Sequence, residues 1–532
     1  MSHSQRPLLL VCICIALLLG LLPAAPARAI GAIVVSSLKD SDSPNADSCT
    51  LREALQAIAN AKIAGQAQSY HECASADPSI NVITFGVAGT IKLNSTLPDI
   101  TSNITMTGPA IIDGNNNVIF RVSADTAIFN FAALTLTKGN PALLVTATSP
   151  VINIAGSSFT DNANDHGSGG AIDGRGKINI AGTNFTANSA VETGGAIHTS
   201  GTDVLNIAGS VFNGNVAKRS GGAVFTQAPA NIVDTLFNGN IAKGEDPDRD
   251  GDDDAFDDYT GLGGGALYSA NDGTDGRKLK LTRVVFNGNL SPKGNGGALF
   301  NAAAAQAEIG QSSFNGNLAG TPPSTNRQGG AINNLNGKLT ISGSVLLNNG
   351  VVGDGGGIAN DRGGNLTLAN VELTANAATG TGGGLRNANT QQGSNIRPQA
   401  TLLNSTLNLN VAPGGGGGIF NQNGPAAGLT LGNTIVAGSD GGGLGGNCAG
   451  GALTSQGHNL DSGTSCGLVG SADLSSADAK LQVPSLNGGP LAALLTQKIG
   501  AGSAAADAGD NAICAAEPVN NQDVRGSTRP KG

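Results

Sequence analysis

The chain has 532 residues, of which 81 are glycine, and it has no tryptophan and only 13% charged residues. So much glycine with so few aromatic residues argues against an ordinary globular core and favours a repeat architecture. Collagen is excluded because glycine follows no strict three-residue period. Disorder is disfavoured because hydrophobic residues, 39% of the chain, are spread regularly between the glycines. The net charge of −9 argues against nucleic acid as a partner, since phosphate binding needs a basic stripe.

The first residues have the pattern of a secretory signal peptide. Arg6 provides a short basic region, residues 8–22 form an apolar run, and Ala-Arg-Ala at 27–29 fits a small-x-small cleavage site. We therefore expect residues 1–29 to be removed and the mature protein to be secreted, either extracellular or at the outer cell surface. An uncleaved anchor is the alternative. No later run of about 18 apolar residues follows, so we expect no transmembrane segment in the mature chain.

Five cysteines belong to the mature chain: Cys49, Cys73, Cys448, Cys466 and Cys514. In an oxidising compartment most of them should be paired. Pairs that each close a short loop would be Cys49–Cys73 and Cys448–Cys466, which leaves Cys514 as the odd residue. The sequence has no Cys-x-x-Cys motif and no nearby histidine cluster, so it predicts no zinc site.

Residues 30–120 are expected to form an N-terminal cap and the first, irregular coils of a solenoid. The stretch CTLREALQAIANA contains a capping box, Thr50-x-x-Glu53, followed by apolar residues at helical spacing. This is the one clear helix that the mature sequence predicts. A helix here would cover the open end of a sheet, and an exposed sheet edge invites aggregation.

Residues 121–436 carry an internal repeat. Each unit places an aromatic or aliphatic residue three positions before an asparagine, and the nine such residues are Phe159, Phe185, Phe212, Phe237, Phe286, Phe314, Leu346, Leu373 and Leu407. Most units then continue with Gly-Gly-Ala and an aliphatic residue. Units of roughly 25–30 residues indicate a solenoid.

Alternating apolar runs, such as KINIAG at 177–182, indicate short strands, and no unit has room for a long amphipathic helix. The sequence therefore predicts an all-β fold, a right-handed parallel β-helix with a short N-terminal capping helix. The Phe or Leu would fill the interior, the Asn would bond to the Asn of the next coil, and Gly-Gly would allow a turn with positive φ. Residues 437–532 would form a disulfide-tied C-terminal cap region.

Three stretches resemble known families. The F-x-x-N and G-G-A-[ILV] words resemble those of polymorphic outer membrane proteins, a group of bacterial surface adhesins. SCTLREALQAIANA, residues 48–61, is similar to the N-terminal element of bacterial CSLREA-domain proteins, with Thr50 where serine is usual. The ending, from LNGGPLAALL to QDVRGSTRPKG, is similar to that of choice-of-anchor exported proteins, which usually have Asp-Gln-Arg-Gly there. The resemblance implies this architecture, export and a place at the cell surface.

The fourth unit is interrupted by GEDPDRDGDDDAFDD, residues 244–258, which looks like a calcium-binding loop. Aspartates at alternate positions followed by a glycine match the start of such a loop. The expected ligands are Asp246, Asp248, Asp250, Asp252 (through its carbonyl oxygen), Asp254 and Asp257. The loop usually closes with a longer glutamate where this chain has Asp257. The sequence predicts a structural Ca²⁺, and a solvated acidic loop is the alternative.

The residue after Gly-Gly-Ala-Ile (or its equivalent) defines a row along the stack: Asp173, His198, Phe225, Tyr268, Phe300, Asn333, Ala359, Arg386 and Phe420. If the preceding aliphatic residue points inward, strand alternation turns this row outward. Asp173 and His198 would then be neighbours on adjacent coils, with His166 in a nearby corner. These three are the candidate catalytic residues, since an Asp–His pair can act in acid–base catalysis. A surface hydrogen bond is the alternative.

Three aromatic residues of this row, Phe225, Tyr268 and Phe300, are the candidate ligand-binding residues. As an exposed strip they could stack on sugar rings or contact a protein. If the row instead faces inward, they belong to the core.

We expect a secreted or cell-surface bacterial β-helix protein, an adhesin-like binding scaffold without a catalytic centre. Its partner would be an extracellular polysaccharide or a host or cell-surface protein. An extracellular polysaccharide lyase or glycoside hydrolase is the alternative, supported by fold analogy alone. An inert structural protein of an envelope or matrix is a third. Binding is favoured because the sequence shows no Gly-His-Gly and no arginine-rich strip facing acidic residues.

Overall fold

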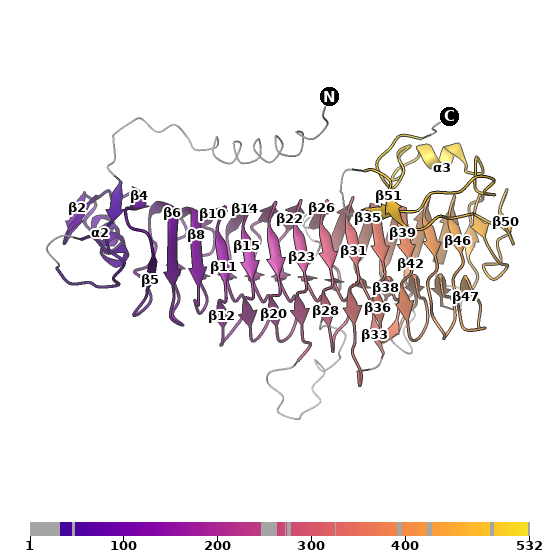
Figure 1. Ribbon diagram of the computed structural model, residues 1–532, viewed down its shortest axis with the longest axis horizontal. Coiled ribbons are helices and arrows are strands. Elements are labelled where there is room, and N and C mark those ends of the chain that lie inside the picture. The colour runs from indigo at the N-terminus through magenta and orange to yellow at the C-terminus, as the bar shows by residue number, and fades with distance from the viewer. Residues whose placement is uncertain are drawn as a thin grey trace.

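The computed structural model describes residues 32–44, 48–245, 263–271, 273, 278–324, 326–390, 396–422, 428–489 and 494–529. Over these residues the chain forms a parallel β-helix, which confirms the predicted fold class. The coils stack into a long rod with a helix at one end (Figure 1). Equivalent residues of successive units are paired in register, as the repeat predicts.

The largest sheet receives two successive strands from most coils and therefore contains two parallel ladders. Its 26 strands are β1 (Ile33–Val35), β4 (Ile80–Phe85), β5 (Thr90–Lys92), β6 (Asn103–Asp113), β8 (Ile128–Thr137), β10 (Val151–Ala155), β11 (Ser158–Thr160), β14 (Lys177–Ala181), β15 (Asn184–Thr186), β18 (Leu205–Ala208), β19 (Val211–Asn213), β22 (Ala230–Val233), β23 (Leu236–Asn238), β26 (Leu279–Thr282), β27 (Val285–Asn287), β30 (Gln306–Gly310), β31 (Ser313–Asn315), β35 (Lys338–Leu347), β39 (Asn365–Thr374), β42 (Gln399–Leu403), β43 (Thr406–Asn408), β45 (Gly428–Gly432), β46 (Ile435–Ala437), β48 (Thr454–Ser455), β49 (Leu460–Asp461) and β50 (Leu474–Ser475).

Two further parallel sheets complete the coils. The twelve-stranded sheet consists of β7 (Phe120–Val122), β9 (Leu143–Val145), β13 (Ile172–Gly174), β17 (Ile197–Thr199), β21 (Val224–Thr226), β25 (Leu267–Ser269), β29 (Leu299–Asn301), β34 (Ile332–Leu335), β38 (Ile358–Asp361), β41 (Leu385–Asn387), β44 (Ile419–Asn421) and β47 (Cys448–Gly450). The eight-stranded sheet consists of β12 (Ala163–Asn164), β16 (Ser189–Ala190), β20 (Val216–Ala217), β24 (Ile241–Ala242), β28 (Leu290–Ser291), β32 (Leu318–Ala319), β36 (Gly350–Val351) and β40 (Ala377–Ala378).

Three small sheets lie outside this frame. They are the antiparallel pair β2 (Gln68–Tyr70) and β3 (Cys73–Ala76), the parallel pair β33 (Arg327–Gln328) and β37 (Gly353–Asp354), and the antiparallel pair β51 (Ser485–Leu486) and β52 (Leu495–Thr496).

The repeated sequence motifs form the interior of the rod, as predicted. The six phenylalanines of the Phe-x-x-Asn motif, from Phe159 to Phe314, are fully buried, and their rings stack face to face with centroids 4.6–4.9 Å apart. Leu346 continues this column in register with Phe314. Each asparagine of the motif bonds to the next, for example Asn215 Nδ2 to Asn240 Oδ1 at 2.9 Å. The buried column is therefore a hydrophobic stack flanked by a continuous amide ladder.

The two glycines of each Gly-Gly pair have different tasks. Gly221 has φ +64°, which glycine adopts without strain. Gly222 lies so close to the next coil that a Cβ would be 2.0 Å from the carbonyl oxygen of Gly265. The second glycine is therefore required by the close approach of neighbouring coils.

The predicted helix α2 (Leu51–Ala64) covers the N-terminal end of the rod. Thr50 and Glu53 form the complete capping box, and Gly65 ends the helix in the left-handed conformation. The predicted disulfides Cys49–Cys73 and Cys448–Cys466 are both present, with Cα–Cα distances of 4.7 and 4.8 Å. Cys514 is a free thiol.

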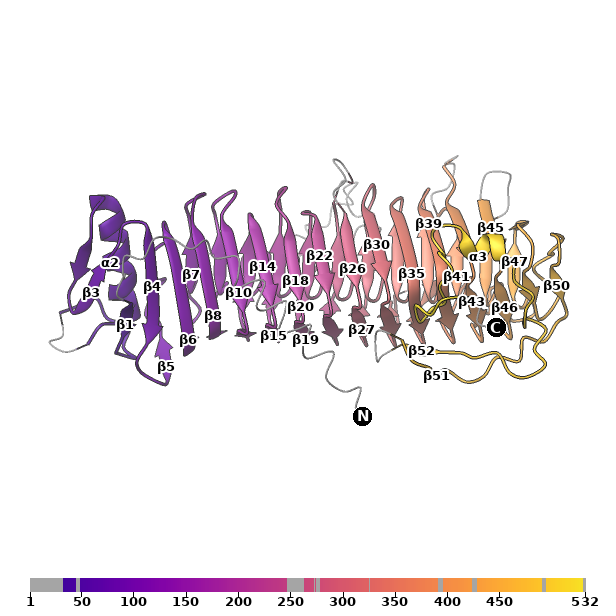
Figure 2. The ribbon, with the colours of Figure 1, turned by 90° about the horizontal axis from the view of Figure 1, so that it is seen from above.

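The predicted C-terminal region, 437–532, has two parts. Strands β47 to β50 continue the coils, whereas residues 494–529 return along the side of the rod, near β39 and β46 (Figures 1 and 2). This second part contains a short helix, α3 (Asn511–Ala515), which the sequence did not predict. The N-cap residue of α3, Asp510, accepts backbone N–H groups as an aspartate in a local turn does. The residues of α3 show no hydrophobic period from which a helix could be predicted.

Candidate functional site

The outer face of the twelve-stranded sheet carries the row of residues that the sequence singled out. Asp173 pairs with His198, His198 with Phe225, and the register continues coil by coil to Phe420. The preceding residues of these strands, such as Ile197 and Val224, belong to the main core. Tyr268 and Phe300 belong to a separate hydrophobic cluster. The row therefore faces outward, as strand alternation predicted.

Asp173 and His198 form the expected pair. The Nδ1 of His198 lies 2.7 Å from Oδ1 of Asp173, and both side chains are partly exposed. On its other side the imidazole stacks on Phe225, with ring centroids 5.5 Å apart. The carboxylate and the aromatic ring thus orient the imidazole from both sides.

His166 does not complete a triad. It lies in the exposed turn between β12 and β13, and its backbone N–H donates to Asn164 Oδ1 at 3.3 Å. Among the described residues, the His166 ring makes no hydrogen bond or ion pair with Asp173 or His198. The structure therefore brings together two of the three candidate catalytic residues.

The aromatic residues stack as a ladder, but only its first ring reaches solvent. Centroids are 4.9 Å apart for Phe225 and Tyr268 and 4.8 Å for Tyr268 and Phe300. Tyr268 is 8% exposed and Phe300 is fully buried, packed with Ala302. The expectation of an exposed strip was wrong for these two rings, which belong to a hydrophobic cluster against which Ala270 and Leu335 pack. Burial raises the pKa of Tyr268 to about 12, and the positive charge of Arg219 opposes the shift.

One coil beyond the ladder the row enters a polar cavity of about 280 Å³. Apart from Leu335, its lining is polar or charged: Asn295, Asn326, Arg327, Gln328, Asn333, Asp354, Asp361, Arg362 and Thr390. Most of these residues come from β33, β34, β37 and β38 and from the turns between them. Arg386 stands in the row two coils after Asn333. Its Nε lies 3.4 Å from Oδ2 of Asp354, which lines the cavity.

The two cavity carboxylates hold the surrounding turns in place. Asp361 accepts the backbone N–H of Thr390 at 2.8 Å and its hydroxyl at 2.6 Å. Asp354 accepts the N–H and the hydroxyl of Thr381 at 2.7 and 2.8 Å. The cavity thus presents arginine and amide side chains beside two carboxylates that fasten the neighbouring turns.

Asn333 supplies a buried polar atom in the cavity. The residue is 1% exposed, and its Oδ1 has no hydrogen-bond partner among the described residues. Its Nδ2 donates to Gln328 at 3.4 Å. A buried acceptor without a partner is costly in a folded protein, so it indicates a place for a ligand or water donor.

The sequence did not predict this cavity. We expected no arginine-rich strip facing acidic residues, yet Arg327, Arg362 and Arg386 lie close to Asp354 and Asp361. Three of these five residues stand in turns or in the β33–β37 pair, outside the repeated words. Asn333 and Arg386 both stood in the row that the sequence singled out, and they were the sequence signals for this site.

The six expected calcium ligands, Asp246, Asp248, Asp250, Asp252, Asp254 and Asp257, lie outside the described residues. The calcium loop therefore remains a prediction.

The repeat model of the Chlamydia polymorphic membrane protein (Chlamydia_PMP) matches residues 209–227. These residues hold Phe212, Asn215, the Gly221–Gly222 pair and the row residue Phe225. No curated protein and no solved structure matches the chain. The match covers one coil and, with the β-helix fold, indicates a surface-exposed bacterial protein. Within the described residues, no helix is long and apolar enough to span a membrane.

Proposed function

We propose that this protein is an exported, adhesin-like scaffold that binds an extracellular polysaccharide on the outer face of the twelve-stranded sheet. The observation that carries the proposal is the polar cavity around Asn333, which continues the row occupied by His198 and Phe225. The Chlamydia_PMP repeat supports a surface location. The likeness to CSLREA and choice-of-anchor proteins supports secretion.

The lining of the cavity favours a carbohydrate with acidic groups. Guanidinium groups bind carboxylates and sulfates through paired hydrogen bonds, and amide side chains bond to sugar hydroxyls. The whole chain has a net charge of −9, so its long-range electrostatic field does not attract an acidic carbohydrate. Recognition must then come from local contacts with Arg327 and Arg362.

Phe225 supplies an apolar surface at the other end of the site. Its ring is partly exposed, and the stacked rings of His198 and Tyr268 hold it on both sides. Because both faces of the ring are occupied, its partly exposed edge is the part that can contact the C–H groups of a sugar, and its rigidity keeps the entropic cost of that contact low. A chain lying along the row would meet this ring and then, past the buried rings, the cavity.

We also propose that the acidic loop at 244–258 binds a structural Ca²⁺. Its alternate aspartates suit the oxygen-rich coordination of Ca²⁺. We expect the ion to order this insertion without taking part in chemistry.

The test uses purified protein, residues 30–532, with a panel of acidic and neutral polysaccharides. Retention on each polymer measures binding, and new reducing ends or unsaturated products measure cleavage, both with and without EDTA. We expect retention on an acidic polymer, lost in Phe225→Ala and Arg362→Gln. Arg121→Gln is the control, since Arg121 stands in the same row four coils before Phe225 and outside the cavity. No retention on any polymer contradicts the proposal.

An enzyme is the second candidate function, favoured by the 2.7 Å contact between Asp173 and His198. Cleavage products that disappear in Asp173→Asn and His198→Asn would establish it and overturn a pure binding role. Products that persist in both variants would exclude the pair as the catalytic centre.

A further inference from the structure

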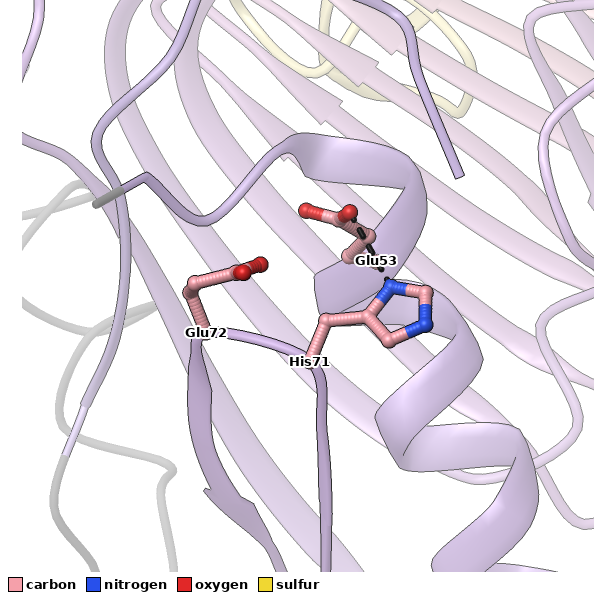
Figure 3. A group of neighbouring side chains, drawn as sticks. All are labelled: Glu53, His71 and Glu72. Carbon is pink, nitrogen blue, oxygen red and sulfur yellow. Dashed lines mark hydrogen bonds and ion pairs between the residues drawn. The ribbon is translucent and has the colours of Figure 1, made fainter. Parts of the chain in front are cut away.

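Three metal-binding side chains meet in the N-terminal cap, far from the candidate site. Glu53 lies in the first turn of α2, and His71 and Glu72 form the turn between β2 and β3. Their ligand atoms all lie within 4.8 Å of one another. Figure 3 shows the carboxylate of Glu72 and the imidazole of His71 reaching from the hairpin toward Glu53.

The cap holds these groups in place before any ion binds. Glu53 is fully buried, and its Oε2 accepts the N–H of Thr50 at 2.9 Å within the capping box. This leaves Oε1 directed at Nδ1 of His71, 3.2 Å away. The disulfide joins Cys49, the residue before Thr50, to Cys73, the residue after Glu72. Covalent and hydrogen bonds thus bring both carboxylates to one place.

Among the described residues, no lysine or arginine balances the charges of this cluster. Within the described part of the chain, the only basic group that pairs with Glu53 is His71, and no lysine or arginine pairs with Glu72. The Oε2 of Glu72 is buried and has no hydrogen-bond partner there. The neighbouring Arg52 bonds instead to Asp40. Two neighbouring carboxylates, of which Glu53 is fully buried and Glu72 has a buried oxygen, favour a cation between them.

We propose that Glu53, His71 and Glu72 bind a Zn²⁺ ion that fastens the β2–β3 hairpin to α2. One imidazole and two carboxylates are a zinc donor set, whereas Ca²⁺ takes six to eight oxygen ligands. Zinc bonds of about 2.0–2.2 Å at a tetrahedral angle place two ligand atoms roughly 3.3 Å apart. The Nδ1 of His71 and Oε1 of Glu53 already have that spacing, at 3.2 Å.

A small movement of Glu72 completes the site. The carboxylate ends a flexible side chain in a hairpin turn, so a rotamer change brings it from within 4.8 Å to coordination distance. The His71 side chain is 21% exposed, which leaves a path for the ion and room for a water as fourth ligand. The ligands come from a helix and a hairpin without a Cys-x-x-Cys or a histidine pair, which is why the sequence pattern did not predict zinc.

The test measures Zn²⁺ binding to the chelator-stripped mature protein by isothermal titration calorimetry, with Co²⁺ absorbance as a report of coordination geometry. The variants are Glu72→Gln and His71→Asn. Glu53 is kept because it caps the helix. The matched control is Glu517→Gln, an exposed glutamate at the opposite end of the rod. Circular dichroism verifies that each variant is folded.

We expect a single Zn²⁺ per chain, a higher thermal midpoint with zinc, and intense Co²⁺ bands typical of a four-coordinate site. Both variants should weaken zinc binding by more than about tenfold and abolish the thermal shift. Glu517→Gln should behave as the unaltered protein. Excess Ca²⁺ should not displace the zinc, which separates this site from the acidic loop. Absence of binding, or binding that the two variants leave unchanged, overturns the proposal.

Discussion

The carboxylate of Glu372 accepts the backbone N–H of Gln497, with Oε2 3.0 Å from the nitrogen, although 125 residues separate the two. Glu372 lies on β39 and is 6% exposed, covered by the returning C-terminal segment. Burial raises the pKa of Glu372 to about 8, while the Gln497 N–H and Arg525 oppose the shift and Asp523 adds to it. The C-terminal segment is thus docked on the rod through a carboxyl group that ionises near neutral pH.

Docking of this segment should weaken with rising pH. In the folded protein Glu372 keeps its proton up to about pH 8, whereas an unfolded glutamate loses it near 4.5. The contribution to stability is therefore complete below pH 4.5, declines above it and is lost above about pH 8. At about 1.4 kcal/mol per unit of pKa, the change amounts to a few kcal/mol. Limited proteolysis of residues 494–529 between pH 5 and 9 measures it.

Glu372→Gln is the matching variant, because it keeps an acceptor for Gln497 and cannot ionise. It should flatten the pH profile and resist proteolysis better than the unaltered protein at pH 9. Glu517→Gln, exposed in the same segment, should retain the original profile. An unchanged profile in Glu372→Gln would show that another group controls docking.

The buried asparagine ladder should contribute more to stability than the exposed one on the same coils. Oδ1 of Asn240 accepts both the backbone N–H and the Nδ2 of Asn215, at 3.0 and 2.9 Å. Asn240→Ala leaves these donors unsatisfied in the interior, and we expect a loss of about 2–4 kcal/mol. Asn213→Ala removes an exposed amide contact and should cost less than about 1 kcal/mol. Urea unfolding compares the two variants, and equal losses would contradict a structural role for the buried amide.

Tyr268, the buried tyrosine of the aromatic ladder, should ionise at a higher pH than an exposed tyrosine. Burial raises the pKa of Tyr268 from its usual 10.0 to about 12, so the stability it contributes is complete below pH 10, declines above it and is lost above about pH 12. A spectrophotometric titration of the three tyrosines should show one step near 12 that disappears in Tyr268→Phe. The pKa of Tyr70 is also raised, by its hydrogen bond to Asp42, and serves as internal comparison. A titration of the unaltered protein that Tyr268→Phe leaves without change above about pH 11 would mean that the ladder is open to solvent.

The two disulfides should stabilise opposite ends of the rod independently. Cys49 and Cys73 are 24 residues apart, and closing a loop of that size stabilises the fold by roughly 3 kcal/mol. Replacing both by serine should speed hydrogen exchange in α2 and β3 and leave β47 unchanged. The double serine variant of Cys448 and Cys466 should have the reverse effect. Uniform exchange along the rod in either variant would show that the coils unfold as one unit.

The amino-acid sequence by itself determined the β-helix, its interior and its N-terminal helix. In a parallel stack each residue lies beside its equivalent in the next unit. The repeat in the sequence therefore predicts which residues contact each other. Phe212 touches Phe237, and Asn215 bonds to Asn240, because the same word recurs one coil later. The capping box of α2 and the outward row from Asp173 follow from local spacing in the same way.

Only the tertiary structure decided which parts of that row are open, and which distant groups meet. Phe300 is buried although its row faces away from the main core, and the cavity around Asn333 combines residues of four strands with residues of the turns between them. Glu372 and Gln497 meet across 125 residues, and Glu53 meets Glu72 because a disulfide joins their neighbours. These contacts join unlike segments, so no pattern along the chain encodes them. They form where the chain folds back onto surfaces that the stacked coils have already built.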